Sequence, residues 1–552
     1  MFQNFRLAMT WVHTWFGLVL GFVLMAAFFF GALSVFDREI DRWAVPESRF
    51  PAQPIPSFDR MLRPVFADMQ PLPAEVDAAR SQVRGAMPSH FDLPMRWGAY
   101  TTHRDPVLNL FAGYELPNAT IPDATVFTSR TMDPRHGTLM SDDQLKIGSE
   151  FFYPLHFSLN LGWMDLGYWI VGLAALIMLV ALVTGVIMHR KIFREFFTFR
   201  PQKRLQRSTL DLHNLTGVVA LPFHFFFAFT GLVIFAGIYF PVAHTQLSPL
   251  HDLHERLESE ETGLPHKRAG VAAPLASVDA MVAEARRRWA GQGMAGEVGF
   301  LSVEFPGDAN SYVSVYRAGT DRVALVGNGV HFKASTGELL REDPPASAVD
   351  GVNEFLTGLH LQHFRHWLLR WFYVLGGLAG CACIATGFIF FVEKRKRQHA
   401  RDGGQGARVV DALAVTTVTG MLVATLGMLI ANRLLPETLP AGWPGRGDAE
   451  RYVFWAAWAL AMLHAFCRTA PVARALPAPA WREQCWAVAG LAVTAVLLNW
   501  VTTGDHLLRT VSAGYWPVAG MDLFMLAGAA LAALAARRLG PPRRGGSPCL
   551  TR

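Results

Sequence analysis

Long apolar runs limit what this chain can fold into more than any other feature. A helix needs about 20 apolar residues to cross a bilayer, and eight stretches approach or exceed that length. They lie at roughly 10–36, 165–188, 213–240, 367–392, 409–431, 452–467, 484–501 and 518–537. Apolar residues make up 51% of the chain and charged residues only 17%, whereas roughly a quarter of a soluble domain is charged. The pattern predicts a mostly α-helical membrane protein with about eight transmembrane helices.

Clusters of Lys and Arg indicate how these helices are oriented. They follow the second run at 189–207, the fourth at 393–401 and the last at 537–544. Because short basic loops stay on the cytoplasmic side, we expect both termini to be cytoplasmic and the protein to lie in a bacterial inner membrane. The long polar segments 37–150 and 241–351 are then periplasmic. The basic clusters contact membrane lipid, and we expect no nucleic-acid partner.

A repeat of about 200 residues is the second strong signal. Several residues of the first half recur in the second at a nearly constant offset: His13, Gly17 and Gly31 as His213, Gly217 and Gly231, and Trp169, Thr184 and Gly185 as Trp371, Thr386 and Gly387. With a two-residue slip, His156 answers to His360. Such self-similarity indicates duplication of one unit. Each unit would be a helix, a periplasmic domain and a returning helix, so four helices form a duplicated core.

The polar segments read as two α+β domains. In the second, 276–290 is predicted as a helix, and strands are predicted at 298–305, 311–317 and 323–332, followed by a turn at 334–338. The first ends with a comparable strand and turn at 126–137. Amphipathic stretches at 148–164 and 352–366 are expected to continue the second and fourth membrane helices outward.

These boundaries divide the chain into eight parts. They are a first membrane helix, the first periplasmic domain, two membrane helices with a basic loop, the second periplasmic domain, a fourth membrane helix, a linker, a four-helix extension and a cytoplasmic tail: 1–36, 37–150, 151–240, 241–351, 352–400, 401–408, 409–540 and 541–552.

Histidines inside or beside the apolar runs are the candidate functional residues. Ionisable groups in membrane helices are costly and point to function. Neutral imidazole binds iron, and facing helices supply axial ligands on both sides of a haem. The candidate cofactor-binding residues are His13, His156, His213, His224, His360 and His363, of which His13, His156, His213 and His360 are the candidate ligands of haem iron. His13 and His213 would form an inner tier, and the others an outer tier.

Other interpretations remain open at each position. A lone interfacial His can be a hydrogen-bonding anchor, and the repeated Gly residues can pack helices rather than make room for a porphyrin. His366 is a weaker candidate. His189, beside Arg190 and Lys191, is expected to be a solvated residue at a helix end, and His464 and His506 are expected to be structural. Cys381 and Cys383 are expected to serve as small packing residues. The chain has no Cys-x-x-Cys-His sequence, so covalent haem attachment is excluded.

Several of these motifs resemble the PepSY-associated transmembrane helix family. The resemblance lies in Arg6 with His13 and Gly17, in His213 with Gly217 and Thr230-Gly231, in the Thr-Gly pairs before each basic cluster, and in the turn Ser335-Thr-Gly-Glu338. It covers about residues 1–400. It implies an iron-regulated membrane protein with PepSY-like outer domains, similar to dihaem b-type ferric-siderophore reductases. The four helices after residue 409 depart from the family pattern.

The reaction that this resemblance implies is electron transfer across the membrane. An unidentified cytoplasmic donor would reduce two b haems in turn, and a ferric siderophore would be reduced outside and release its iron. Two alternatives stay open: a non-enzymatic protein whose outer domains bind a partner, and a permease for an iron chelate. The siderophore, the donor, the pairing of the His ligands, the role of the last four helices and the oligomeric state are not predicted.

Overall fold

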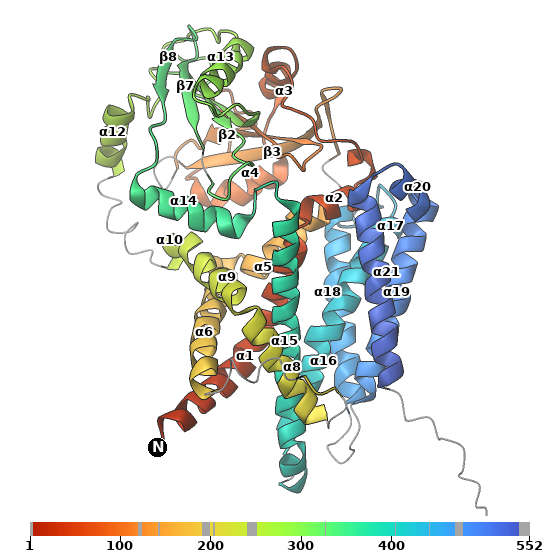
Figure 1. Ribbon diagram of the computed structural model, residues 1–552. Helices are drawn as coiled ribbons and strands as arrows, with labels where there is room; N and C mark the ends of the chain where they lie inside the picture. The colour runs from red at the N-terminus through yellow and green to blue at the C-terminus, as the bar shows by residue number, and fades with distance from the viewer. Residues whose placement is uncertain are drawn as a thin grey trace, which may run out of the picture. The chain divides into compact units, whose positions relative to one another are not determined.

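The structure is a computed structural model. It describes residues 4–119, 124–141, 144–189, 199–201, 205–239, 251–325, 327–402, 404–440, 442–469 and 478–539. The chain divides into two units (Figure 1). The helical unit comprises Met1–Pro46, Asp143–Leu232 and Leu368–Arg552, and the sheet unit comprises Glu47–Asp142 and Val233–Trp367.

The helical unit is formed by the apolar runs. Its elements are α1 (Phe5–Ser34), α2 (Asp37–Ala44), η4 (Ile147–Phe152), α5 (Tyr153–Ser158), η5 (Trp163–Asp165), α6 (Leu166–Met188), α8 (Leu205–Val219), α9 (Leu221–Ile234), α15 (Trp367–Arg401), α16 (Gly406–Val415), η7 (Thr416–Gly420), α17 (Met421–Leu434), α18 (Arg446–Arg468), α19 (Pro479–Thr503), α20 (Leu507–Ser512) and α21 (Trp516–Arg538). Among the described residues, six helices are long and apolar enough to span a membrane, and the bent pair α8–α9 would be a seventh. The protein is therefore a multi-pass membrane protein.

Two details of the predicted spans differ from the structure. The third run is not one straight helix, because α8 and α9 meet at an angle of 63°. Pro222, in the first turn of α9, has no N–H to continue the hydrogen-bond ladder of α8. His213 on α8 and His224 on α9 therefore do not lie on one straight helix. The sixth run forms α18 but falls outside the helices that pass the length and hydropathy criteria.

The amphipathic stretches do not continue the membrane helices, contrary to the prediction. Leu159 and Asn160 adopt left-handed backbone conformations (φ 52° and 53°) that end α5 before α6 begins. Gln362 (φ 57°) likewise ends α14 (Ala348–Leu361) before α15. After the first break the chain turns so tightly that a Cβ on Gly167 would lie 1.7 Å from the carbonyl oxygen of Ser158, so only glycine fits there.

One antiparallel sheet forms the centre of the sheet unit. Its strands are β1 (Pro94–Tyr100), β2 (Leu108–Glu115), β3 (Thr125–Asp133), β4 (Thr138–Leu139), β5 (Val298–Glu304), β6 (Tyr312–Arg317), β7 (Gly329–Lys333) and β8 (Leu339–Glu342). Their order is β4-β3-β2-β1-β5-β6-β7-β8. The two polar segments, predicted as two domains, therefore share a single sheet that joins at β1 and β5. The predicted strand 323–332 is shorter than expected.

Some of the helices of this unit cover one face of the sheet. The remaining elements of the unit are η1 (Pro46–Ser48), η2 (Phe58–Leu62), α3 (Arg63–Asp68), α4 (Pro73–Ala79), η3 (Arg80–Gln82), α10 (Ala236–Tyr239), α12 (His251–Thr262), α13 (Val278–Gly291) and α14. Phe66 and Trp289 of these helices belong to the same hydrophobic core as Leu110, Val303 and Val315 of the strands. Side chains alternate along each strand, so the residues between these core positions point to the opposite face.

The helix starts of the two halves cap each other. Asp59 accepts hydrogen bonds from the hydroxyl of Ser277 (2.7 Å) and from the N–H groups of Val278 and Asp279. Asp279 in turn accepts from the hydroxyl of Ser57 (2.5 Å) and from two N–H groups, of Phe58 and Asp59. Each carboxylate thus satisfies orphan N–H groups of the other half.

This mutual capping predicts a pH dependence of stability. Burial raises the pKa of Asp59, but the hydrogen bonds from Ser277, Asp279 and Val278 outweigh that effect, and the pKa is lowered overall. A lowered folded-state pKa stabilises the protein above the unfolded value of about 3.9, and this stabilisation is lost as the pH falls through the folded value. We expect the protection factors of the amides in the first turn of α13, which correct for the intrinsic pH dependence of exchange, to fall below about pH 4.

An Asp59→Asn variant isolates the effect. Its α13 amides should have lower protection factors than those of the native protein at pH 6. These protection factors should change less between pH 5 and 3, because the side-chain amide of Asn does not titrate there. Asp92→Asn, at a carboxylate whose side chain is 84% exposed, is the matched control and should leave the pH profile unchanged. Equal profiles for the native protein and Asp59→Asn would contradict the assignment.

Candidate functional site

His13 and His213 meet inside the helical unit. The Nδ1 atom of His13, on α1, lies 3.0 Å from the carbonyl oxygen of Ala181 and 3.3 Å from the hydroxyl of Thr184, both on α6. The Nδ1 atom of His213, on α8, lies 2.8 Å from the carbonyl oxygen of Cys383 on α15. A carbonyl can only accept, so each Nδ1 carries the proton and donates it. Each ring is thereby oriented by a neighbouring helix.

The two imidazole rings lie close together in an edge-to-face arrangement. Their centroids are 6.2 Å apart, and their planes are nearly perpendicular at 89°. With the proton on Nδ1, Nε2 of each ring carries the lone pair. Among the described residues no hydrogen bond to either Nε2 is recorded. Two imidazoles from separate helices therefore present lone pairs within one part of the helical unit.

Matching residues surround the two rings. An added Cβ on Gly185 would lie 3.4 Å from Cε1 of His13, and one on Gly387 would lie 3.4 Å from Cε1 of His213. Thr184 and Thr386 each donate a hydroxyl hydrogen bond to the carbonyl that also receives the His proton. The first-half contacts thus recur in the second half. An added Cβ on Gly17, one turn after His13, would meet nothing within 4 Å.

His156 lies farther along α1 from His13. Its Nδ1 atom is 2.8 Å from the carbonyl oxygen of Ala27. Gly31 makes this approach possible, because an added Cβ there would come within 2.7 Å of Nδ1. The repeated glycine Gly31 therefore serves the imidazole, in addition to any role in helix packing.

His224 is buried between helices. It is 1% exposed, its ring meets Phe28 edge to face, and its Nε2 lies 3.2 Å from the carbonyl oxygen of Gly376. Its Nδ1 is buried and has no hydrogen-bond partner in the described part of the chain. A buried nitrogen lone pair without a partner is uncommon, so His224 keeps its place among the candidates.

The remaining histidines fall into two groups. His360, His363 and His366 belong to the sheet unit, so the pairing of His360 with His156 stays a prediction. His464 binds Glu483 at 3.0 Å, and His506 accepts from an N–H at the start of α20, in agreement with structural roles. No group of three or more His, Cys, Asp or Glu side chains arranged for a metal ion occurs in the described ranges.

Sequence reasoning missed one neighbour of His213. The sulfur of Cys383 lies 3.4 Å from Nδ1 of His213 and 3.6 Å from the carbonyl oxygen of the same residue. The corresponding position of the first half, at an offset of 202, is Ala181. The two inner histidines therefore differ in one contact. Comparing the halves residue by residue would have revealed the difference between Ala181 and Cys383, though not the contact with His213.

A hydrogen-bonded row in the sheet unit also escaped prediction. The hydroxyl of Ser314 lies 2.8 Å from Nδ1 of His331, whose Nε2 lies 3.1 Å from a carboxylate oxygen of Asp343. Hydrolytic enzymes use these three residue types. Ser314 and His331 are both only 3% exposed, so a substrate does not reach the hydroxyl. We assign this row to holding β6, β7 and the end of β8 together.

A multi-pass helical unit with two neighbouring histidines from separate helices, joined to an α+β unit, defines the class of this protein. The model of the family "PepSY-associated TM region" matches residues 10–394, and the chain belongs to that family. The chain is also similar to a Pseudomonas aeruginosa protein described as "Uncharacterized protein PA4219", with 29% identity over 414 residues, which is 70% of this chain and 95% of that protein.

Proposed function

We propose that this protein is a dihaem b-type inner-membrane reductase that passes electrons from a cytoplasmic donor to a periplasmic ferric siderophore. The observation that carries the proposal is the close pair of imidazoles of His13 and His213. If both Nε2 atoms bind one iron at about 2 Å, the usual length of a metal–imidazole bond, the ring centroids lie roughly 6 Å apart, because each centroid is about 1 Å behind its nitrogen. The measured separation is 6.2 Å.

The neighbouring groups support this use of the imidazoles. A ligating His usually donates its other N–H to a carbonyl or carboxylate, which fixes the tautomer and the orientation of the ring. His13 and His213 both donate to helix carbonyls. Gly185 and Gly387 keep side-chain bulk away from the rings, as a flat macrocycle would require. The family assignment and the repeated contacts favour one origin for the two halves, by duplication.

The second tier is proposed on sequence grounds and on the contacts of single residues. His156, with its Nδ1 bonded to Ala27, and His360, its counterpart in the repeat, would hold the second haem, and His224 and His363 are further candidates. Haem b, when bound at both tiers, supplies one-electron carriers at two depths of the membrane. The residues themselves orient the imidazoles, because the Nδ1 atoms of His13, His156 and His213 each donate to a helix carbonyl.

The chemistry of the proposed substrate explains why its reduction would release iron. Siderophore oxygens are hard ligands that prefer Fe(III), so adding one electron weakens the chelate and frees iron as Fe(II). Both termini would be cytoplasmic, as the basic clusters predict. The assignment to the PepSY-associated family supports a multi-pass membrane protein. The electron donor and the particular siderophore are left open.

An absorption spectrum with haem quantitation tests the proposal. Protein purified from haem-replete cells should show a Soret band that shifts on reduction with dithionite, and about two haems per chain. Reduction of a ferric siderophore by the dithionite-reduced protein, followed as reoxidation of the haem, tests the reaction. A colourless preparation from such cells would rule the proposal out and favour a partner-binding or permease role.

Cys383 allows a finer prediction. Its sulfur accepts weakly from the Nδ1–H of His213 and so makes that imidazole more basic, which favours Fe(III). Cys383→Ala should keep full haem content, because the backbone carbonyl remains, and should move the midpoint potential of one haem to a more positive value. Cys381→Ala, two residues away, is the control and should leave both potentials in place. An unchanged redox titration for Cys383→Ala would contradict this role.

A further inference from the structure

The face of the sheet opposite the covering helices carries a line of matched side chains. Phe127 pairs with Gly113, Gly113 with Arg96, Arg96 with Glu304, and Glu304 with Tyr312. Paired residues of neighbouring strands point to the same face. The five residues therefore form one row across β3, β2, β1, β5 and β6, and the row crosses the junction between the two halves.

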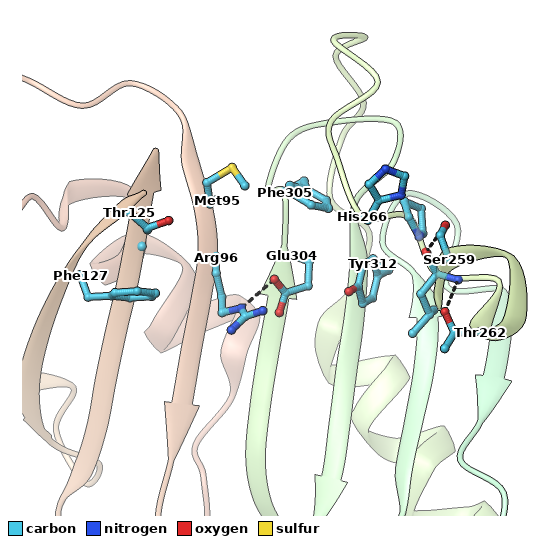
Figure 2. A pocket seen from close by; sticks show the side chains of 13 residues that line it. Met95, Arg96, Thr125, Phe127, Ser259, Thr262, His266, Glu304, Phe305 and Tyr312 are labelled. Carbon is cyan, nitrogen blue, oxygen red and sulfur yellow. Dashed lines mark hydrogen bonds and ion pairs between the residues drawn. The ribbon is translucent and has the colours of Figure 1, made fainter. Parts of the chain in front are cut away.

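This row forms the floor of a cavity of ≈ 300 Å³ (Figure 2). Met95, at a bulge of β1, and Phe305, in a left-handed conformation at the end of β5, form one wall. The other wall is the end of α12 and the chain that follows it, including His266. Gly113 leaves the floor open beside the Phe127 ring, since an added Cβ would come within 2.8 Å of that ring.

Arg96 presents unused donors to this cavity. Its Nε donates to Glu304 at 2.7 Å, and the other carboxylate oxygen of Glu304 accepts from the hydroxyl of Ser302 at 3.0 Å. The Glu304 side chain is only 9% exposed, whereas that of Arg96 is 46% exposed. No hydrogen bond to the two Nη atoms of Arg96 is recorded among the described residues. Glu304 therefore holds one edge of the guanidinium and leaves the other for a ligand.

An aromatic surface lies in the same row. The Phe127 ring is 54% exposed although it sits on the sheet, and Tyr312 and Phe305 line the cavity on the other side of Arg96. Aromatic rings stack on one another in offset or edge-to-face geometry. Guanidinium groups bind carboxylates through two parallel hydrogen bonds. The volume is at the small end of ligand pockets, which suits a single ring with one acidic group.

We propose that this cavity binds a planar aromatic acid, with the carboxylate on the Nη atoms of Arg96 and the ring against Phe127. A cationic ligand is disfavoured, because Glu304 is buried and already accepts from Arg96 and Ser302. The acid is either a free aromatic carboxylate or an aryl arm of an iron chelate. The second source rests on the proposed reductase function, whereas the first does not.

The full-length protein in detergent, titrated with benzoate by calorimetry or ligand-observed NMR, tests the proposal. Benzoate should bind, cyclohexanecarboxylate should bind more weakly for lack of a π face, and benzyl alcohol should bind more weakly for lack of charge. Arg96→Gln and Phe127→Ala should each weaken benzoate binding about tenfold, the equivalent of about 1.4 kcal/mol. Arg135→Gln is the matched control, because Arg135 is paired with Asp133 in the same unit, and should bind as the native protein does.

The outcomes separate this proposal from the reductase function. No benzoate binding, or equal binding by native protein and both cavity variants, overturns the cavity site whether or not the protein contains haem. Benzoate binding that depends on Arg96 in a colourless preparation supports the cavity site and removes the reductase. Tighter binding of the ferric complex of 2,3-dihydroxybenzoate than of the metal-free acid assigns the site to a chelate arm, and the reverse assigns it to the free acid.

Discussion

Replacing His213 by Ala is expected to remove about half of the haem from the purified protein. The reason is that His13 and His213 would bind a single iron, so a haem that loses one of these two imidazole ligands would no longer be retained by the protein. The rings lie 6.2 Å apart on different helices, and each is oriented by its own carbonyl contact. His13→Ala should therefore lower haem content by the same amount.

The double variant gives the sharpest form of this prediction. If the two residues share one iron, His13→Ala combined with His213→Ala should lose no more haem than either single variant, because coupled residues are non-additive. His464→Ala, at a residue that binds Glu483 instead, should retain both haems. Haem is quantified per chain by the pyridine haemochrome spectrum. Full haem content in both single variants would disprove the shared ligation.

Replacing Asp522 by Ala is expected to destabilise the helical unit strongly. Asp522 on α21 is 1% exposed and accepts hydrogen bonds from the indole N–H of Trp43 (2.9 Å) and from the amide of Asn499 (3.3 Å). Both donors are fully buried. A buried donor that loses its acceptor costs about 1–3 kcal/mol, so we expect a loss of roughly 2–5 kcal/mol in the free energy of unfolding.

Matched variants separate this hydrogen bonding from a general effect of charge. Asp522→Asn keeps an acceptor oxygen and should lose less stability than Asp522→Ala. Asp448→Ala removes a carboxylate that is 53% exposed and paired with Arg451, and it should change stability by less than about 0.5 kcal/mol. Thermal unfolding in detergent, followed by tryptophan fluorescence, measures all three. Equal midpoints for Asp522→Ala and Asp448→Ala would show that the contact contributes nothing.

This network also assigns a structural role to the four helices after residue 409. Arg433 of α17 donates to the carbonyl oxygens of Trp43 (3.0 Å) and Ala44, while Asp522 of α21 binds the Trp43 ring. The short helix α2, directly after the first membrane helix, is therefore held by the last part of the chain. The C-terminal helices secure the end of α1, on which His13 lies.

The sequence by itself determined the features that follow from local or repeated patterns of residues. Apolar runs must become helices in lipid, because every backbone group has to be satisfied within the segment, and six of the predicted spans are present in the described residues. The constant offset between His13 and His213 singled out two residues that the structure brings into contact. The helix near 276–290 and most strands of the second polar segment also followed from periodicity.

Only the tertiary structure decided how distant segments combine. Strand patterns do not say which edge a strand will pair with, so they could not predict that β1 and β5 would join the two halves in one sheet or that Phe127, Arg96 and Tyr312 would line one cavity. The contact of Cys383 with His213, and that of Asp522 with Trp43, depend on helix packing across hundreds of residues. Such pairings are set by the free energy of the whole fold, because no local pattern of residues encodes which partner a side chain will meet.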